Sequence, residues 1–423
     1  MTHLACASDA AALGSRKQLH ASPGRLPVRT ALSWTRQRAT SPRPRAADGE
    51  ARSVAERGPA ERLARRRRSL KSHKAHTGGP RIRSNNRERL SLRKQRGRRI
   101  VSLHLEADTL DDLLRETYEH ILRTGRPVGN TQGDSLETLG ASLVLHQPRN
   151  RISRTETRYI YVTPLAELCW YLSGSRSGEM ITAYIDKYRD YVEADGNVFG
   201  GYGPRIFGDG ANRQVRNAAD TLRQNPSSRR VVVQFLDKAD MYGERHKDIP
   251  CTNTMQFLIR DGSLHAIVSM RSNDAWMGLV HDVFAFTMIQ EMVARDLGAD
   301  LGTYTHFVGS LHLYQDNLGS ARTFVDEGLQ ATTSPMDEMP QGSPWNGVEQ
   351  LVAAEQAARL GRSSSEVLLP DEPYWADLGR ILVACQLRKA GVTPAAINLE
   401  REIGLQPIRE LLDRKATRGN DEC

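Results

Sequence analysis

The spacing of apolar and polar residues becomes regular near Ile100 and predicts both strands and helices from there to about residue 325. Residues 100–107 alternate as a strand does. Residues 107–125 place their apolar side chains on one face of a helix, with acidic residues in its first turn and Gly125 at its end. Further strands are predicted at ETLGASLVL (137–145), RYIYV (158–162), RRVVVQFLD (229–237) and TYTHFVGSLHLY (303–314), and further helices at PLAELCWYLSG (164–174), QVRNAADTLRQN (214–225) and VFAFTMIQEMVARD (283–296).

Two turn-rich stretches and a later change of pattern define the domain organisation. The segment 254–272 predicts a β-hairpin whose turn is Asp261-Gly262, and the Gly-rich segment 195–210 predicts a backbone that wraps around a ligand. From about residue 328, a linker-like stretch and then three short amphipathic helices between 347 and 415 are expected. We therefore predict an α+β catalytic domain over residues 100–325, a sheet with packed helices, followed by a linker and a helical C-terminal extension over residues 326–423.

The positive charge of the chain comes entirely from its first hundred residues. Residues 1–100 hold 26 Lys and Arg against 6 Asp and Glu, whereas the remaining residues hold 33 against 44. A segment with so few apolar side chains cannot offset its chain entropy, so residues 1–99 are predicted to be a disordered, Arg-rich tail. Such a tail is compatible with nucleic-acid binding, with a transit peptide or with a solvated extension, and no nucleic-acid-binding motif accompanies it.

The cysteines and the absence of long apolar runs narrow the possible classes of protein. Cys6, Cys169, Cys251, Cys385 and Cys423 are odd in number and form no C-x-x-C or Cys/His cluster, so no zinc site, disulfide framework or other metal centre is predicted. No run approaches the ~20 apolar residues of a membrane span. A cytoplasmic protein without a membrane partner is predicted, in which one thiol can serve chemistry.

Six short motifs, collinear along the chain, carry that chemistry. They are AELCWYLSG (166–174), GGYGPR (200–205), NPSSRRVVVQ (225–234), IPCTNTMQF (249–257), RSNDAWMGL (271–279) and GSLHLY (309–314). Taken alone, such a cysteine is more often an inert small hydrophobe, and such arginines are solvated charges. Taken together and in this order, the motifs make residues 100–325 resemble thymidylate synthase and its relatives, the pyrimidine-nucleotide hydroxymethylases. The N-terminal and C-terminal hundred residues lie outside the resemblance.

The resemblance implies catalytic roles for three residues. Cys251 would be the nucleophile that adds to C6 of a pyrimidine ring and thereby makes C5 nucleophilic. Glu167 is a carboxyl in an otherwise apolar helix and would handle protons near C5 and the exocyclic group of the base, although a structural salt bridge is the alternative. Tyr202 would help to move the C5 proton.

The resemblance also implies how a nucleotide phosphate is held. Arg271 and Ser272 would bind the 5′-phosphate together with Arg229 and Arg230, which in this family come from the neighbouring subunit. The implied assembly is therefore a homodimer with shared active sites.

Three further residues would contact the sugar and the cofactor. His312 and Tyr314 lie two apart on one predicted strand, so they point the same way and would bond the sugar hydroxyl, unless they are a buried pair satisfied locally. Asp274 would bond the pterin of 5,10-methylene-tetrahydrofolate, the implied cofactor.

Asp282 determines which base the resemblance implies. In thymidylate synthases an asparagine at this place donates to O4 of uracil and accepts N3–H. An ionised carboxylate only accepts, so it fits the N4 amino group and a protonated N3 of cytosine and leaves O4 of uracil without a donor. The resembling cytidylate and deoxycytidylate hydroxymethylases share the aspartate. Alternatively, Asp282 only caps a helix that begins at Val283.

The chain departs from thymidylate synthases at three other places. Thr252 replaces the histidine that follows the nucleophile in many of them. Asn130 stands where an early phosphate-binding arginine is expected, and Arg126 is a possible substitute. The chain ends in RGNDEC rather than in a short apolar tail that closes the site, which is compatible with deliberate addition of water.

These observations lead to a hypothesis with two alternatives. The hypothesis is a hydroxymethyltransferase that transfers a one-carbon unit to C5 of CMP or dCMP and then adds water, giving 5-hydroxymethyl-CMP or 5-hydroxymethyl-dCMP. The first alternative is a thymidylate synthase or uridylate-type methylase. The second is a non-catalytic, nucleic-acid-binding protein that uses the basic tail.

Overall fold

The computed structural model describes residues 102–418 apart from 131–132, 159, 243–244, 331–332 and 364. The predicted Arg-rich tail, residues 1–99, lies outside the described residues. A mixed seven-stranded sheet runs through the described part in the order β1-β3-β7-β6-β5-β4, with β2 paired to β3. The strands are β1 (His104–Ala107), β2 (Arg126–Asn130), β3 (Gly133–Leu145), β4 (Val232–Gln234), β5 (Thr252–Arg260), β6 (Ser263–Asp274) and β7 (Asp300–Tyr314).

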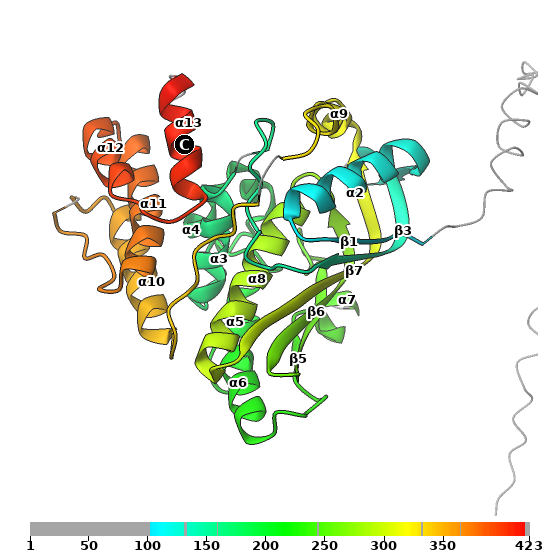
Figure 1. Cartoon of the computed structure of the whole chain (residues 1–423), viewed down its shortest axis with the longest axis horizontal. Helices are drawn as coiled ribbons and strands as arrows, with labels where there is room; N and C mark the ends of the chain where they lie inside the picture. The colour runs from blue at the N-terminus through cyan, green and yellow to red at the C-terminus, as the bar shows by residue number, and fades with distance from the viewer. Residues whose placement is uncertain are drawn as a thin grey trace, which may run out of the picture. The chain divides into compact units, whose positions relative to one another are not determined.

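Helices cover one face of this sheet, and the mixed architecture confirms the predicted α+β class. They are α2 (Leu110–Thr124), α3 (Val162–Leu172), α4 (Gly178–Thr182), α5 (Gly203–Ile206), α6 (Gln214–Gln224), α7 (Lys238–Tyr242), α8 (Gly278–Leu297) and α9 (Leu318–Asp326). Two of them make parallel crossovers: α2 connects β1 to the β2-β3 hairpin, and α8 connects β6 to β7. In Figure 1, α8 lies against the sheet with α3 beside it.

The predicted hairpin forms as the sequence indicates. β5 and β6 pair antiparallel from Arg260–Ser263 inward. Asp261 and Gly262 between them both have positive φ, 50° and 81°. That conformation matches the right-handed twist of the two strands, and Asp-Gly adopts it readily.

Two predicted elements differ from those observed. Of the run 158–162, the described residues 158, 160 and 161 do not belong to a strand, and Val162 already begins α3. A short apolar run cannot by itself distinguish a strand from a buried helix segment. Arg158 leads into this helix and stacks over the ring of Trp276 at 4.8 Å. The second difference is that α8 begins at Gly278, five residues before the predicted start at Val283. Asp282 therefore lies within the helix and does not cap it.

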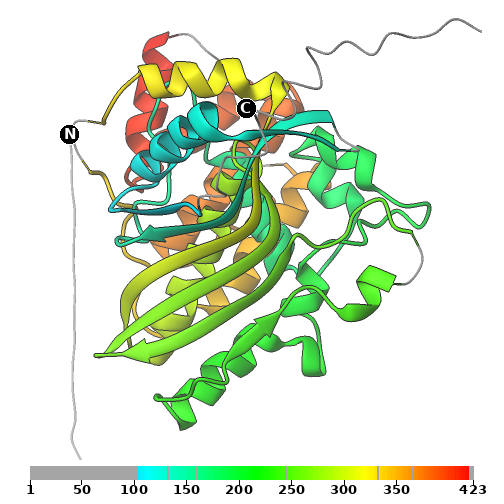
Figure 2. The same ribbon diagram turned by 90° about the vertical axis from the view of Figure 1, so that its right-hand side faces the viewer.

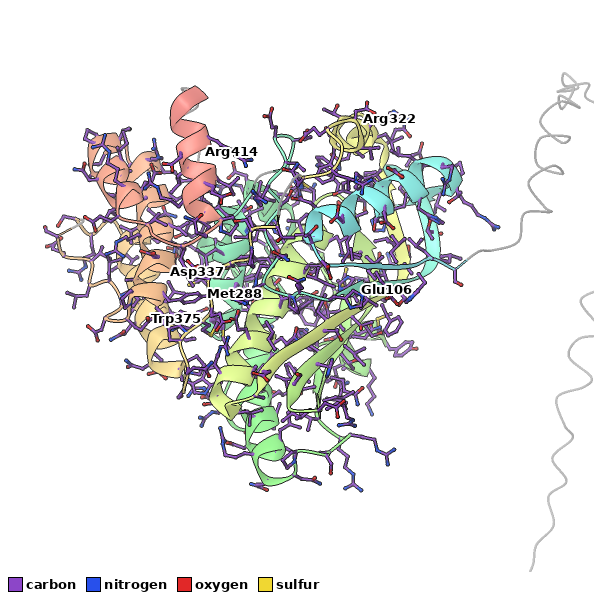
Figure 3. All side chains as sticks on the ribbon, in the orientation of Figure 1. Glu106, Met288, Arg322, Asp337, Trp375 and Arg414 are labelled. Carbon is purple, nitrogen blue, oxygen red and sulfur yellow. The ribbon has the colours of Figure 1, made fainter. Side chains whose placement is uncertain are left out.

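The C-terminal extension consists of four described helices rather than three. They are α10 (Trp345–Arg359), α11 (Pro373–Lys389), α12 (Thr393–Arg401) and α13 (Ile408–Arg418). Apolar side chains of α10, α11 and α13 join the same hydrophobic core as α3 and α8, whereas Ala396 of α12 belongs to a second cluster with residues of α10 and α11. Tyr374 of α11 donates its hydroxyl to the sulfur of Met288 in α8 at 3.6 Å, and Figure 3 labels Met288 and the neighbouring Trp375 in this region. The extension is thus packed on the helical layer.

The opposite face of the sheet carries exposed apolar side chains. Figure 2 looks onto this face, and no helix of the described part crosses it in that view. Leu139, Val232 and Phe307, from three different strands, are each at least 40% exposed. A hollow of about 450 Å³ on the sheet is lined by residues of β3, β5, β6 and β7, Arg271 among them. Among the described residues, no helix combines the length and apolar character needed to cross a membrane.

A buried ion pair ties the linker to the core. Arg151 contacts Glu291 of α8, and both side chains are fully buried. The other oxygen of Glu291 accepts a hydrogen bond from the backbone N–H of Met339 at 3.0 Å. Since α8 passes between the sheet and the extension, this carboxylate joins three parts of the chain.

Glu291→Ala should therefore lower the free energy of unfolding by about 3–5 kcal/mol, because it leaves the Arg151 guanidinium buried without its partner. The exposed pair of Arg216 and Glu349, 3.0 Å apart, provides the control, and Glu349→Ala should cost no more than about 1 kcal/mol. Urea unfolding measures both. Equal losses for the two variants would contradict this account.

Candidate active site

A cleft of about 920 Å³ opens where α3, the first turn of α8 and the C-terminal ends of β6 and β7 meet. It gathers most of the side chains predicted to act together. The predicted residues in its lining are Glu167, Tyr202, Cys251, Arg271, Ser272, Asp274, Asp282, His312 and Tyr314. Arg229 and Arg230 do not line it. Both are exposed just before the edge strand β4.

Cys251 ends the loop that enters β5, and Arg271 fixes this loop. The guanidinium of Arg271 donates from Nε to the carbonyl of Pro250 at 3.0 Å and from Nη2 to that of Ile249 at 2.8 Å. The backbone N–H of Arg271 donates to the carbonyl of Cys251 at 2.8 Å. The loop that carries the Cys251 thiol is therefore held in place by Arg271 of the neighbouring strand β6.

The surroundings of Cys251 do not favour its thiolate. Burial raises the pKa of the thiol to about 11; Arg271 opposes this rise, and Asp248 and Asp282 add to it. Among the described residues of one chain, the charged groups that shift this pKa are thus one cation and two carboxyls. A thiolate is favoured by an electropositive setting, and the described residues of one chain do not provide it.

The hydroxyl oxygen of Tyr202 is held by Thr252, the residue that follows Cys251. It accepts hydrogen bonds from the backbone N–H and the hydroxyl of Thr252, at 3.2 and 3.0 Å. Burial raises the pKa of Tyr202 well above its usual value, so the phenol stays protonated at neutral pH. With its oxygen already accepting twice, the hydroxyl of Tyr202 is left to donate, and Tyr202 lines the cleft. Thr252, the departure from thymidylate synthases noted above, is part of this arrangement.

Glu167 is held by three donors that the sequence did not indicate. Its Oε1 accepts from the hydroxyls of Tyr171 at 2.6 Å and Tyr188 at 2.5 Å, and its Oε2 lies 2.6 Å from Nδ1 of His281. Burial by itself raises the pKa of Glu167, but the bonds and charge of these partners outweigh it and hold the pKa below its usual value. Tyr171 is four residues from Glu167 on α3, a spacing from which that contact was predictable.

Asp282 is buried at the end of a chain of polar side chains. Its Oδ2 accepts from the amide of Asn273 at 2.7 Å. The amide oxygen of Asn273 lies 3.1 Å from Nε2 of His306, and Nδ1 of His306 lies 2.7 Å from the hydroxyl of Tyr304. Burial lowers the pKa of His306 to about 3, so its ring is neutral and has a single N–H.

The donors in this chain therefore all point one way. The phenol of Tyr304 donates to His306, the ring N–H of His306 donates to Asn273, and the amide of Asn273 donates to Asp282. Burial, together with the nearby charge of Glu167, raises the pKa of Asp282 well above its usual value. Burial thus favours the protonated form of this carboxyl, whereas the sequence-based prediction takes it as ionised.

The remaining residues alternate along two adjacent parallel strands. Ser272 and Asp274 of β6 are in register with Ser310 and His312 of β7. Asp274 accepts the backbone N–H of Trp276 at 2.9 Å, and the His312 ring packs edge-on against Tyr314 with centroids 4.9 Å apart. These side chains form one wall of the cleft.

Comparison with known proteins gives a consistent picture. The thymidylate synthase family model matches residues 114–339. The chain is similar to a thymidylate synthase of Symbiobacterium thermophilum, with 27% identity over 246 residues that cover 53% of this chain and 82% of that protein.

The charge balance around Cys251 is directly testable. Asp248→Asn should lower the pKa of the thiol, since it removes a negative charge that raises it, and Arg271→Gln should raise the pKa. Below the pKa the thiolate fraction changes about tenfold per unit of pKa, so alkylation at pH 8 should be several-fold faster in the first variant and slower in the second.

Mass analysis of the Cys251 peptide after iodoacetamide treatment measures these rates, and Cys251→Ser corrects for the other thiols. Faster alkylation in Arg271→Gln would show that this arginine does not favour the thiolate.

Proposed function

Because this chain belongs to the thymidylate synthase family, whose members transfer a one-carbon unit from 5,10-methylene-tetrahydrofolate to C5 of a pyrimidine nucleotide, we propose that it acts on a cytosine nucleotide. The product is 5-hydroxymethyl-CMP or 5-hydroxymethyl-dCMP, formed by addition of water. The observation that carries this proposal is Asp282, a buried carboxyl where thymidylate synthases have an amide, set at the end of a one-way chain of donors.

The proton on Asp282 supports cytosine rather than uracil. N3 of cytosine is a free base, and its neighbour is an N4 amino donor. The proton that burial favours on Asp282 can pass to N3 or be shared with it, and the resulting carboxylate then accepts from N3, from N4 and from Asn273. In this arrangement N3 and N4 of cytosine both have a hydrogen-bond partner, whichever oxygen of Asp282 faces N3.

Uracil fits less well. Its N3 already holds a hydrogen and its O4 needs a donor, so the proton must stay on Asp282 and on the oxygen that faces O4. When that oxygen is Oδ2, it would have to carry a proton while accepting from Asn273. Each misplaced buried polar contact costs roughly 1–3 kcal/mol.

The other residues supply the steps around the base. Cys251 adds to C6, which turns C5 into the carbon that takes the one-carbon unit. Tyr202 and Glu167 lie on the cleft wall to receive and return protons. The folate supplies the one-carbon unit, and Asp274, Met277 and Trp170 in the same lining provide a carboxyl and apolar surface that suit a pterin. His312 and Tyr314 would hold the sugar.

A homodimer with shared sites fits the charges in the cleft. Members of this family are usually dimeric, and the exposed apolar sheet face offers a surface for a second copy. Arg271 lines both the cleft and the hollow on that face, so a partner on the face would stand next to the phosphate position. Arg229 and Arg230 of the partner would then add the positive charge that one chain lacks, and would also favour the thiolate of Cys251.

Thymidylate synthesis is the second candidate. It is favoured by the similarity to a thymidylate synthase and by the burial that raises the pKa of Asp282, because a protonated carboxyl can imitate an amide. In that case folate would supply a hydride instead of water entering the reaction.

Asp282→Asn should shift the preference from cytosine toward uracil nucleotides. The amide can donate to O4 and accept N3–H but brings no proton for N3 of cytosine. Two contacts of roughly 1–3 kcal/mol reverse together, so the ratio of kcat/KM for matched CMP and UMP, or dCMP and dUMP, should move by at least about a hundredfold.

The exposed Asp300, at the start of β7, provides the control, and Asp300→Asn should leave the ratio unchanged. If Asp282→Asn also leaves both ratios unchanged, this carboxyl does not read the base.

Mixing two inactive variants tests the shared site. A chain with Arg229→Ala and Arg230→Ala should regain activity when it exchanges subunits with a Cys251→Ala chain, because each heterodimer has one intact site. A 1:1 mixture should reach about a quarter of wild-type activity, since half the dimers are mixed. Arg271→Ala with Cys251→Ala should show no rescue, because both residues serve the same chain's site. Absence of rescue in the first mixture, with exchange confirmed, would mean that the sites are not shared.

A further inference from the structure

His281 occupies the cleft wall between the base-reading and proton-handling residues. It precedes Asp282 in the first turns of α8, is 8% exposed and lines the cleft. Its Nδ1 lies 2.6 Å from Oε2 of Glu167, and its Nε2 lies 3.1 Å from the hydroxyl of Thr163. Glu167 and Thr163 belong to α3, so the ring bridges two turns of that helix.

The ring can take up a proton without losing a partner. When His281 is neutral with its hydrogen on Nδ1, it donates to Glu167 and accepts from the hydroxyl of Thr163. When Nε2 gains a proton, the same hydroxyl rotates and accepts instead, because a hydroxyl both donates and accepts. Both protonation states are therefore fully hydrogen-bonded.

Glu167 alone is poorly suited to collect protons. Its two oxygens already accept from Tyr171, Tyr188 and His281, and these bonds favour its ionised form. The charged or titratable groups that face His281 are Glu167 and, through it, the two tyrosines from α3 and from the 3₁₀ turn Asp186–Tyr191, with Asp282 adjacent in α8. No other cation among the described residues contacts Glu167, so the proton on this cluster is exchanged between Glu167 and His281.

The proposed reaction requires two protons to be collected. One leaves C5 when the one-carbon unit is attached. The other leaves the water molecule when its oxygen bonds to the exocyclic methylene carbon, as the electron pair of that double bond moves into the ring and expels the Cys251 thiolate. The two hydrogens gained by the nitrogens of the released tetrahydrofolate balance both losses.

We propose that His281 and Glu167 act as one acid–base unit, in which Glu167 faces the reacting atoms and His281 stores the proton that Glu167 receives from the attacking water. In this proposal His281 affects the reaction only through the proton that it exchanges with Glu167. This inference rests on the proposed function, because thymidylate synthesis transfers a hydride at the same stage and has no water to deprotonate.

Two substitutions separate proton storage from mere positioning. His281→Asn keeps an N–H that can donate to Glu167 but has no basic nitrogen, whereas His281→Phe removes both. A proton-storing His281 predicts that both variants lose about a hundredfold in kcat, the usual lower range for general acid–base catalysis, with KM for the nucleotide changed less than about threefold. The acidic limb of the kcat profile should disappear with the imidazole.

A purely structural His281 predicts a different pattern. His281→Asn would then keep nearly wild-type kcat while His281→Phe loses it, and that result would overturn the proposal. Wild-type rates in both variants would overturn it as well. His265, bonded to the hydroxyl of Thr303 at 2.9 Å outside the cleft, is the matched control, and His265→Asn should leave kcat unchanged.

A measurement that needs no catalysis tests the pairing of His281 with Glu167 independently of which base is the substrate. In ¹⁵N-histidine NMR of the intact protein, the hydrogen of His281 should lie on Nδ1, and Glu167→Gln should change the Nδ1 resonance because it replaces the carboxylate that accepts this hydrogen bond. An Nδ1 resonance that Glu167→Gln leaves unchanged would overturn the pairing. A product lacking the hydroxymethyl group, with the NMR result intact, would instead reject the proposed function.

Discussion

The carboxyl of Asp282 is held inside the protein by donors that all point toward it, and this constraint determines what the cleft can bind. Buried polar groups must find partners because water cannot reach them. One oxygen of Asp282 accepts from the amide of Asn273, which is itself held by His306 and, through it, by Tyr304. Only the remaining hydrogen-bonding capacity of the carboxyl faces a ligand, and burial raises its pKa, which favours the protonated form. A base able to share that proton is therefore the best complement.

In the described part of one chain, the region around Cys251 holds more carboxyl groups than cations that shift the pKa of its thiol. Burial raises the pKa of Asp248 as well as that of Asp282, and both carboxyls raise the pKa of the Cys251 thiol. Among the described residues, Arg271 is the cation that lowers the pKa of this thiol. If the active sites are shared as proposed, Arg229 and Arg230 of a second copy would add positive charge to the cleft.

Much of the arrangement of the cleft was predictable because its residues belong to short motifs that are local in the sequence. The hairpin turn, the nucleophile loop and the alternating residues of β6 and β7 follow from turn chemistry and strand period. The partners of Glu167 were harder to predict, because Tyr188 and His281 reach it from segments distant in sequence. The raised pKa of Asp282 could not be predicted, since it depends on burial that periodicity does not quantify. The strand predicted at 158–162 was wrong because a short apolar run also suits the start of a buried helix.

The central claim is that this member of the thymidylate synthase family hydroxymethylates a cytosine nucleotide. The most direct measurement is incubation of the full chain with 5,10-methylene-tetrahydrofolate and each of CMP, dCMP, UMP and dUMP, followed by mass analysis of the nucleotides. This account predicts a 5-hydroxymethylated product from CMP, dCMP or both, with the oxygen derived from labelled water, and no comparable product from the uracil nucleotides. Formation of 5-methyluracil nucleotide from UMP or dUMP, with CMP and dCMP unchanged, would contradict it.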